Sequence, residues 1–521
     1  MEDVNSNEIA IKKPPSDILF DTIGNFGKWQ FRISLLMALL RLPIAWFQLG
    51  NILLAPSDVC HMPNISNIST NYQSCQFGYE YNRTQFQSTI ITEWDLVCDR
   101  KGLVDLSLFL LMIGILIGNI LFGITADLYG RKSSLIFAIA AQSICGIIMS
   151  LTPDFWVFTL FRFLGGVANG GTLTISFVLC MEVVGGKYRT IIPILYQIPF
   201  GLGSALMALL GYWIRDWREL QLTLSVLSIL FLFNFWLCSE SPRWLLVTGK
   251  KEKAYKLLEE ICAINKLPKA NIKMATHELI LSSDKSDVKS DEKTINFKSI
   301  FKSPILLKRT LILYLNWFMN GFTFFAFSLR LGSVGTNPWI TVGMGGLAVI
   351  PGAILCVCCL QRLGRKVSLI SANILGMISF ILIQLIPPSL NYLNLLLVLM
   401  AVISLSVSLP GLYLYTGELF PTVVRNAGIG SSAMFSRLGS LLSPIIFAFG
   451  TMQTGGLLQS EYWSNGPPIL LILATLSALQ AILICPLPET KDKPLPDTIE
   501  EAIYHVFHGK NARDTIHGHL F

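Results

Sequence analysis

The sequence is short of charge. Only 14% of its 521 residues are Asp, Glu, Lys or Arg, against about 25% in ordinary soluble domains. So few ionised side chains do not cover a water-facing surface of this size, and much of the surface must face something other than water. This shortage excludes a soluble enzyme, a nucleic-acid-binding protein and a disordered scaffold. The net charge of +7 therefore needs an explanation other than nucleic-acid binding.

Ionisable groups are also missing from the middle of the hydrophobic stretches. All six histidines lie outside those stretches, and the acids nearest to them lie at their ends: Asp105, Asp127, Glu182 and Glu418. A buried proton relay, a metal centre or an intramembrane hydrolase then has no obvious residues. A Gly-x-x-x-x-Gly-Lys-Ser/Thr motif is absent as well, so ATP is not expected to drive the protein. The sequence predicts no enzyme, no metal site and no cofactor.

The sequence contains many long apolar stretches. A membrane-spanning helix takes about 20 apolar residues, and twelve stretches qualify: 30–54, 103–125, 133–151, 155–178, 190–212, 219–238, 309–329, 338–360, 367–387, 392–416, 427–451 and 467–487. Lys and Arg concentrate in alternate connecting segments, so the positive-inside rule places both termini in the cytosol. The predicted fold is an all-α integral membrane protein with 12 transmembrane helices in two six-helix halves.

The spans divide the chain into five parts. We expect a cytosolic tail, a first half, a cytosolic central loop, a second half and a cytosolic tail over residues 1–29, 30–239, 240–308, 309–490 and 491–521. An extracellular loop over 55–102 interrupts the first half. Within the central loop, residues 251–262 read as a short amphipathic helix, because Ala254, Leu257, Leu258 and Ile261 share one face.

The extracellular loop carries signs of an oxidising, lumenal environment. It holds three N-x-S/T sequons, at Asn64, Asn67 and Asn82. Glycosylation of such a site requires lumenal exposure. The loop also holds three of the 11 cysteines, Cys60, Cys75 and Cys98. An odd number permits one disulfide and leaves one thiol, and the pairing stays open.

The two halves repeat each other. Gly130-Arg131-Lys132 follows the second span, and Gly364-Arg365-Lys366 follows the eighth. Glu182 precedes Arg189 by seven residues after the fourth span, as Glu418 precedes Arg425 after the tenth. Related halves with a binding site between them are typical of secondary transporters.

Several motifs resemble a known family. Gly123-x-x-x-Asp127-x-x-Gly130-Arg131-Lys132 resembles the signature loop of the major facilitator superfamily, and residues 92–98, 240–244 and 415–426 are similar to its organic cation, carnitine and organic anion transporter branch. The resemblance implies a plasma-membrane carrier of small organic ions that works by alternating access. The lack of residues for a buried proton relay favours facilitated diffusion or exchange. In the second signature loop Val357 and Gln361 stand where Gly and Asp are usual, so we expect fewer ionic contacts there.

Two arginines lie near the middle of their spans, Arg41 in the first and Arg437 in the eleventh. An ionised residue near the bilayer centre costs about 2.5–3.5 kcal/mol on insertion scales, so it normally faces a cavity or a partner. A guanidinium binds a carboxylate through two parallel hydrogen bonds. The resemblance adds that cation carriers tend to have Asp at the position of Arg437. Together these points favour a carboxylate-bearing zwitterion, such as a carnitine-like compound, or an organic anion.

Amide and aromatic residues complete the predicted substrate site. Gln48 shares a helix face with Arg41, and Asn320 lies on one stripe with Phe324. The full predicted set is Arg437, Arg41, Gln48, Asn320, Phe324, Tyr413 and Gln197. Each of the aromatic and amide residues also reads as an ordinary helix-packing residue. Gly166-x-x-x-Gly170 and Gly201-x-Gly203 indicate close helix packing rather than nucleotide binding.

Charged residues at the cytosolic span ends predict a conformational latch. Its members are Asp127, Arg131, Glu182, Arg189, Glu418 and Arg425. We expect the latch to close the cytosolic side and to break when the two halves rock.

Two other functions stay open: a polyspecific organic cation transporter, and a non-transporting receptor or scaffold with the same fold. The predicted partners are a small organic ion and the lipid bilayer, with no nucleic acid.

Overall fold

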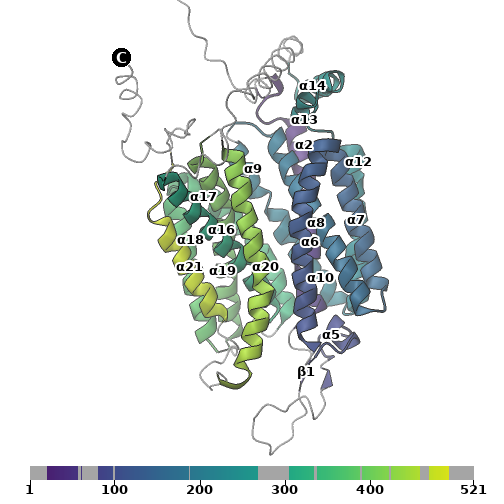
Figure 1. Ribbon diagram of the computed structural model, residues 1–521, viewed down its shortest axis with the longest axis vertical. Coiled ribbons are helices and arrows are strands. Elements are labelled where there is room, and N and C mark those ends of the chain that lie inside the picture. The colour runs from purple at the N-terminus through teal and green to yellow at the C-terminus, as the bar shows by residue number, and fades with distance from the viewer. Residues whose placement is uncertain are drawn as a thin grey trace, which may run out of the picture.

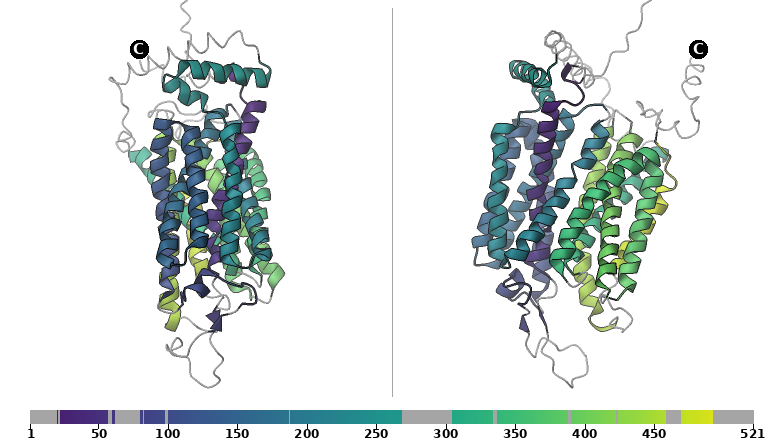
Figure 2. Two further views of the ribbon diagram at one scale, coloured as in Figure 1. Left: turned by 90° about the vertical axis from the view of Figure 1, so that its right-hand side faces the viewer. Right: turned by 180° about the vertical axis from the view of Figure 1, so that it is seen from behind.

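The computed structural model describes residues 20, 22–56, 60–61, 80–81, 83–97, 100–186, 188–267, 304–333, 337–387, 390–421, 424–457 and 469–491. Two bundles of long helices lie side by side, and each is built from one half of the chain (Figures 1 and 2). Ten helical segments are long and apolar enough to cross a membrane. The longer helix α20 and the shorter apolar helix α21 bring the number to the twelve that the sequence predicts.

The N-terminal half contains the first six spans. Their helices are α2 (Lys28–Leu39), α3 (Arg41–Leu49), α4 (Asn51–Leu54), α6 (Gly102–Tyr129), α7 (Arg131–Leu151), α8 (Phe155–Val183), α9 (Tyr188–Leu195), α10 (Ile198–Trp213), α11 (Trp217–Ile229), η3 (Leu230–Phe233) and α12 (Asn234–Leu237). The C-terminal half contains α16 (Pro304–Arg330), η6 (Leu331–Ser333), α17 (Pro338–Arg362), α18 (Arg365–Leu385), α19 (Asn391–Leu419), α20 (Arg425–Leu457) and α21 (Ile469–Ile484).

Short elements mark the two ends of the bundles. One end, here called the loop end, carries β1 (Cys60–His61), β2 (Glu80–Tyr81) and α5 (Ile90–Glu93). The opposite end, here called the tail end, carries α13 (Pro242–Val247) and α14 (Lys251–Asn265) (Figure 1). The predicted amphipathic helix is confirmed as α14, whose buried residues are Ala254, Leu257, Leu258, Ile261 and Cys262.

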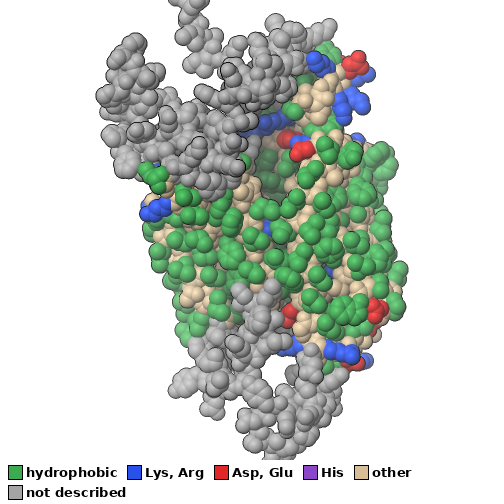
Figure 3. Space-filling model, in the orientation of Figure 1, with side chains coloured by type: hydrophobic (Ala, Val, Ile, Leu, Met, Phe, Trp, Pro, Cys, Tyr) green, Lys and Arg blue, Asp and Glu red, His purple; other side chains and the backbone are tan. Residues whose placement is uncertain are grey.

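Hydrophobic side chains cover the middle of the molecule, and charged side chains gather at its two ends (Figure 3). Large apolar residues stay exposed there, among them Leu128, Phe137 and Ile482, each more than 60% exposed. A soluble protein does not expose so broad an apolar surface. The exposed band is the surface that the charge shortage in the sequence implies, and it faces the hydrocarbon of a bilayer.

Proline explains two interruptions in the predicted spans. The first span is divided at Leu40 between α2 and α3. Pro43 lies three residues later and has no N–H, so a carbonyl one turn earlier loses its helical partner. The fifth span is divided between α9 and α10, where Pro199 follows the turn at Gln197. Both interruptions lie beside Arg41 and its partners.

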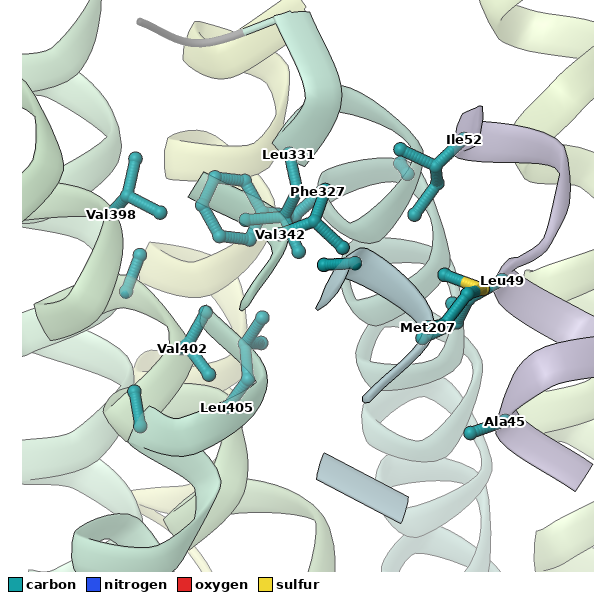
Figure 4. Packing of buried hydrophobic residues seen from close by; sticks show 14 of the residues in the cluster. Ala45, Leu49, Ile52, Met207, Phe327, Leu331, Val342, Val398, Val402 and Leu405 are labelled. Carbon is teal, nitrogen blue, oxygen red and sulfur yellow. The ribbon is translucent and has the colours of Figure 1, made fainter. Parts of the chain in front are cut away.

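The two halves meet most closely toward the loop end. A Cβ atom at Gly201 of α10 would lie 2.4 Å from the carbonyl oxygen of Gly346 in α17. Ile52 of α4 and Leu331 of η6 belong to one buried cluster that joins the halves (Figure 4). The predicted packing role of Gly201 is thus confirmed, and the loop end is closed in this conformation.

Candidate functional site

Arg41 lies in the interior against the break between α9 and α10. Its Nη2 donates to Oε1 of Gln197, and its guanidinium lies 5.1 Å from the ring centroids of both Tyr196 and Phe200. Arg41 is only 8% exposed, and its Nε has no hydrogen-bond partner. The proline-induced break therefore positions Gln197 to hold a buried cation that pairs with no carboxylate in the described part of the chain.

Arg437 projects from α20 toward the same region from the other half. Its guanidinium lies near that of Arg41, and Tyr413 of α19 lies near both. Among the described residues, no carboxylate pairs with either guanidinium. Arg437, Tyr413 and Gln197 are half-buried rather than sealed. The structure thus brings four predicted site residues together around two unneutralised positive charges.

Aromatic rings surround these charges. Tyr413 lies 4.3 Å from Trp317 of α16 and 5.8 Å from Phe177 of α8, measured between ring centroids. Phe324 of α16 lies 6.1 Å from Phe200 of α10, so this pair also joins the two halves. Such walls provide apolar area for an organic group while the guanidinium groups provide charge.

Two predicted residues, Gln48 and Asn320, lie elsewhere. The Gln48 amide donates to Oδ1 of Asn169 at 2.9 Å, and Asn169 donates to Gln142 at 3.3 Å. This chain of hydrogen bonds lies within the N-terminal bundle. Gln48 is 3% exposed, which matches a role in holding α3, α7 and α8 together.

Asn320 has an equivalent arrangement in the C-terminal half. Its amide donates to Oγ of Ser408 at 2.9 Å, and Ser408 donates to Asn373 at 3.0 Å. These hydrogen bonds connect α16, α19 and α18, as the hydrogen bonds of Gln48 and Asn169 connect α3, α8 and α7 in the first half. A role for Asn320 or Gln48 in substrate binding stays a prediction. Their amide nitrogens bond to neighbouring helices, whereas Oδ1 of Asn320 has no hydrogen-bond partner among the described residues.

Sequence reasoning missed another buried arginine, Arg162 of α8, which is 3% exposed. Its guanidinium donates to Asn51 at 2.9 Å and to Ser107 at 3.3 Å, and lies 5.5 Å from the Phe158 ring. Its position seven residues inside α8 could have revealed it. The sequence could not have identified its hydrogen-bond partners, because Asn51 and Ser107 lie on two other helices.

At the tail end, Arg131 joins the predicted latch residues of the first half. Its Nη2 pairs with Asp127 at 2.8 Å and with Glu182 at 3.2 Å. In the second half Arg365 takes this place and pairs with Glu418 at 2.8 Å. Arg365 thus has one acid partner where Arg131 has two, as expected from Gln361, although its pair also includes hydrogen bonds from Nε.

The glutamates of the repeated seven-residue spacing bond to arginines of other helices. Glu182 and Glu418 bond to Arg131 and Arg365, and not to the arginines seven residues after them. Arg189 lies 5.9 Å from the Phe20 ring, and Nε of Arg425 donates to the carbonyl of Phe420 at 3.3 Å.

Sequence reasoning also missed two acids that cap helices. Glu240 accepts hydrogen bonds from the backbone N–H groups of Arg131 and Lys132 at 2.9 and 3.2 Å. Glu489 accepts from Arg365 and Lys366 at 2.9 and 3.0 Å. Each carboxylate lies at the positive N-terminal end of a spanning helix. The Glu that recurs at the end of each half could have indicated these two caps from the sequence.

Two opposing effects set the pKa of the Glu489 carboxyl. Burial raises the pKa of this carboxyl, whereas backbone N–H groups of Lys491, Arg365, Lys366 and Thr490 lower it, and the net pKa lies below its ordinary value. Glu489 is therefore ionised at neutral pH, as a helix-capping carboxylate needs to be.

Some predicted residues lie outside the described part of the chain. They are the three sequon asparagines and the cysteines of the first loop at 75 and 98, and nothing is described of the Cys60 side chain.

Known proteins similar to the chain identify its family. Residues 65–501 match the family model "Sugar (and other) transporter". The chain is 31% identical to the rabbit organic anion transporter 3, over 93% of each chain. It is 30% identical to mouse solute carrier family 22 member 3, over 84% of this chain and 75% of that one. It belongs to this transporter family, in its organic ion branch.

Two further similarities support the assignment. The organic cation transporter protein of Drosophila melanogaster is 28% identical over 93% of this chain and 94% of its own length. The inward-open xylose transporter XylE from E. coli superposes with a TM-score of 0.64 at 18% identity, over 89% of this chain and 98% of that one. The latter likeness shows the major facilitator fold. The protein is thus a multi-pass membrane transporter of organic ions and not an enzyme.

Proposed function

We propose that this transporter carries organic ions bearing a carboxylate, either anions or carnitine-like zwitterions. The supporting observation is the pair of interior guanidinium groups of Arg41 and Arg437, which have no carboxylate partner among the described residues. Two positive charges in a low-dielectric interior repel each other, and a bound carboxylate relieves this repulsion. The aromatic rings of Tyr413 and Trp317 then contact the organic part of the substrate.

Transport proceeds in this proposal by alternating access, as facilitated diffusion or exchange. The substrate binds between the halves, and rocking of the halves exposes it to one side at a time. The half-buried state of Arg437 and Gln197 fits a site that retains access to solvent.

The tail-end charges serve as the latch in this proposal. Asp127 is the member suited to change partners, because its side chain is 71% exposed whereas that of Arg131 is 12% exposed. Arg189 and Arg425 are proposed to join the latch only when the tail end closes, since they bond elsewhere in this conformation.

We infer the orientation and the domain plan from the charge distribution. The tail end, with residues 1–29, 240–308 and 491–521, faces the cytosol, and the loop 55–102 is glycosylated on the outside of the plasma membrane. The halves comprise 30–239 and 309–490. Much of the net positive charge lies in the central loop and in short connections such as Gly364-Arg365-Lys366, where it sets the orientation.

Uptake by cells that express the protein tests the substrate class. Labelled carnitine, benzoate and tetraethylammonium are compared for the wild type, Arg437→Ala and a control, Arg362→Gln, whose arginine is exposed at the end of α17. We expect saturable uptake of a carboxylate compound and a loss of about tenfold or more in Arg437→Ala, since a charge-assisted hydrogen bond contributes about 1.5–3 kcal/mol.

Two results would favour the other functions. Preferred uptake of tetraethylammonium that Arg437→Ala leaves unchanged supports an organic cation transporter, whose cation would bind the aromatic walls. Absence of saturable uptake of all three compounds, by protein shown to be at the cell surface, supports a receptor or scaffold.

A further inference from the structure

The segment at residues 86–96 crosses the loop end and is folded against the N-terminal half. We call this segment the strap. Thr89 caps α5 by accepting a hydrogen bond from the N–H of Thr92 at 3.1 Å. Thr89 and Ile90 have no exposed surface. The strap is therefore a packed part of the loop end rather than a free connection.

The strap is attached to the turn between α10 and α11. The N–H of Gln87 donates to the carbonyl of Arg215 at 3.0 Å, and Ser88 forms a parallel β-bridge with Asp216. These are backbone contacts, so they depend on the path of the chain and not on particular side chains.

A second attachment joins the strap to the ends of α7 and α11. The Glu93 carboxylate accepts from Nε1 of Trp217 at 2.6 Å and from Nε of Arg218 at 3.0 Å. Arg218 also donates to the carbonyl of Ser150 at 2.7 Å. Trp94 donates to the carbonyl of Pro153 at 3.0 Å. With both attachments on one half, the strap must move with the N-terminal half.

Phe86, at the start of the strap, reaches across to the C-terminal half. Its ring centroid lies 4.8 Å from that of Trp339, at the beginning of α17. Phe86 is 6% exposed and Trp339 is 7% exposed. On another side, a Cβ atom at Gly211 of α10 would lie 2.5 Å from Cζ3 of Trp339. The indole of one half is thus enclosed by Phe86 and Gly211 of the other.

We propose that the strap is part of the gate that closes the loop end, with Phe86 as the residue that covers Trp339. The strap stays fixed to the N-terminal half while the halves rock, so opening of the loop end must separate Phe86 from Trp339. Loss of this contact shifts the equilibrium toward the conformation that is open at the loop end. The inference rests on the alternating motion proposed above, and it is independent of the substrate.

A disulfide cross-link measures closure of the loop end without any substrate. A Cβ atom at Gly332 of η6 would lie 2.7 Å from Cγ2 of Ile52 in α4, so the pair Ile52→Cys and Gly332→Cys joins the halves when the gate is closed. The rate of cross-linking under mild oxidation is followed after cleavage at a protease site inserted within residues 268–303. Protein without the added pair gives the background from native cysteines.

Four variants are introduced into the protein that carries Ile52→Cys and Gly332→Cys. We expect Phe86→Ala to shift the equilibrium of the loop end about tenfold toward the open form, the equivalent of about 1.4 kcal/mol, and thereby to slow cross-linking. Trp339→Ala is expected to have a similar effect, and the double variant no greater one, because both changes remove the same contact. Gln87→Ala is the control, since its side chain is exposed and its backbone hydrogen bond remains.

Phe86→Leu distinguishes loss of the ring contact from loss of folding. It preserves apolar volume without the ring, and an intermediate rate with an unchanged thermal unfolding midpoint supports the gate. Unchanged cross-linking in folded Phe86→Ala overturns it, as do fully additive effects of Phe86→Ala and Trp339→Ala. Failure of organic anion uptake with a normal response of cross-linking contradicts the proposed substrate and leaves the gate supported.

Discussion

At the scale of single residues, burial separates the predicted site into two groups. Arg437, Tyr413 and Gln197 keep exposed surface in the interior, whereas Gln48 and Asn320 are sealed and hydrogen-bonded to neighbouring helices. The sequence could place all five within predicted spans, because hydropathy gives the span and helical periodicity gives the face. It could not tell which face meets the other half, since that depends on how separate helices pack.

Glu489 allows a prediction about pH. Its folded pKa is depressed, so its contribution to stability is full above the pKa of the unfolded chain, about 4.3 for Glu, and is lost as pH falls through the folded value. Glu489→Gln is expected to lower stability near pH 7 by about 1 kcal/mol, as loss of a helix cap does. Thermal unfolding of the purified protein from pH 7 down to pH 4 measures the difference.

The wild type and Glu489→Gln should converge toward the acidic end of that series. The exposed Glu260→Gln serves as the control and should match the wild type throughout. A stability difference that grows as pH falls would be incompatible with a capping carboxylate.

At the scale of elements, the sequence predicted the spans well but not their ends. The predicted span 103–125 is α6, Gly102–Tyr129, and 133–151 is α7, Arg131–Leu151. Hydropathy marks the part of a helix that lies in hydrocarbon, and helices continue beyond it into the interface. The caps from Glu240 and Glu489 join distant segments, so the repeated Glu could mark them in the sequence but could not identify the helices that they cap.

The packing of α6 against α8 gives a prediction with an internal control. A Cβ atom at Gly118 would lie 2.0 Å from the carbonyl oxygen of Val167, whereas one at Gly123 meets nothing within 4 Å. Gly118→Ala is expected to destabilise the protein by about 1–3 kcal/mol, the usual cost of overpacking. Gly123→Ala is expected to be neutral or slightly stabilising, because Ala favours helix. Thermal unfolding and surface expression compare the two, and equal effects would contradict this helix crossing.

At the scale of the whole molecule, the halves are related but unequal. Arg131 shares two acids, one of them exposed, whereas Arg365 has a single acid with several hydrogen bonds. The sequence showed the repeated arginines and the departure at Gln361. It did not show that the acids seven residues before Arg189 and Arg425 bond to other arginines in this conformation.

The latch gives a prediction about rates. The i, i+4 pair of Arg131 with the exposed Asp127 contributes only about 0.3–0.5 kcal/mol to stability. Asp127→Asn is therefore expected to leave the unfolding midpoint nearly unchanged and to reduce transport severalfold, because its partners change when the halves rock. Uptake per molecule at the cell surface measures this, with Glu260→Gln as the exposed control. Normal transport by Asp127→Asn at the surface would falsify the latch.

The most direct test of the central claim, that Arg437 recognises a carboxylate, compares two ligands of nearly the same shape. Binding of the preferred carboxylate compound and of its neutral primary amide is measured on the purified wild type and on Arg437→Gln. We predict that the wild type binds the carboxylate about tenfold or more tightly than the amide, and that Arg437→Gln binds the two about equally. Equal binding by the wild type, or a preference that survives in Arg437→Gln, would contradict the claim.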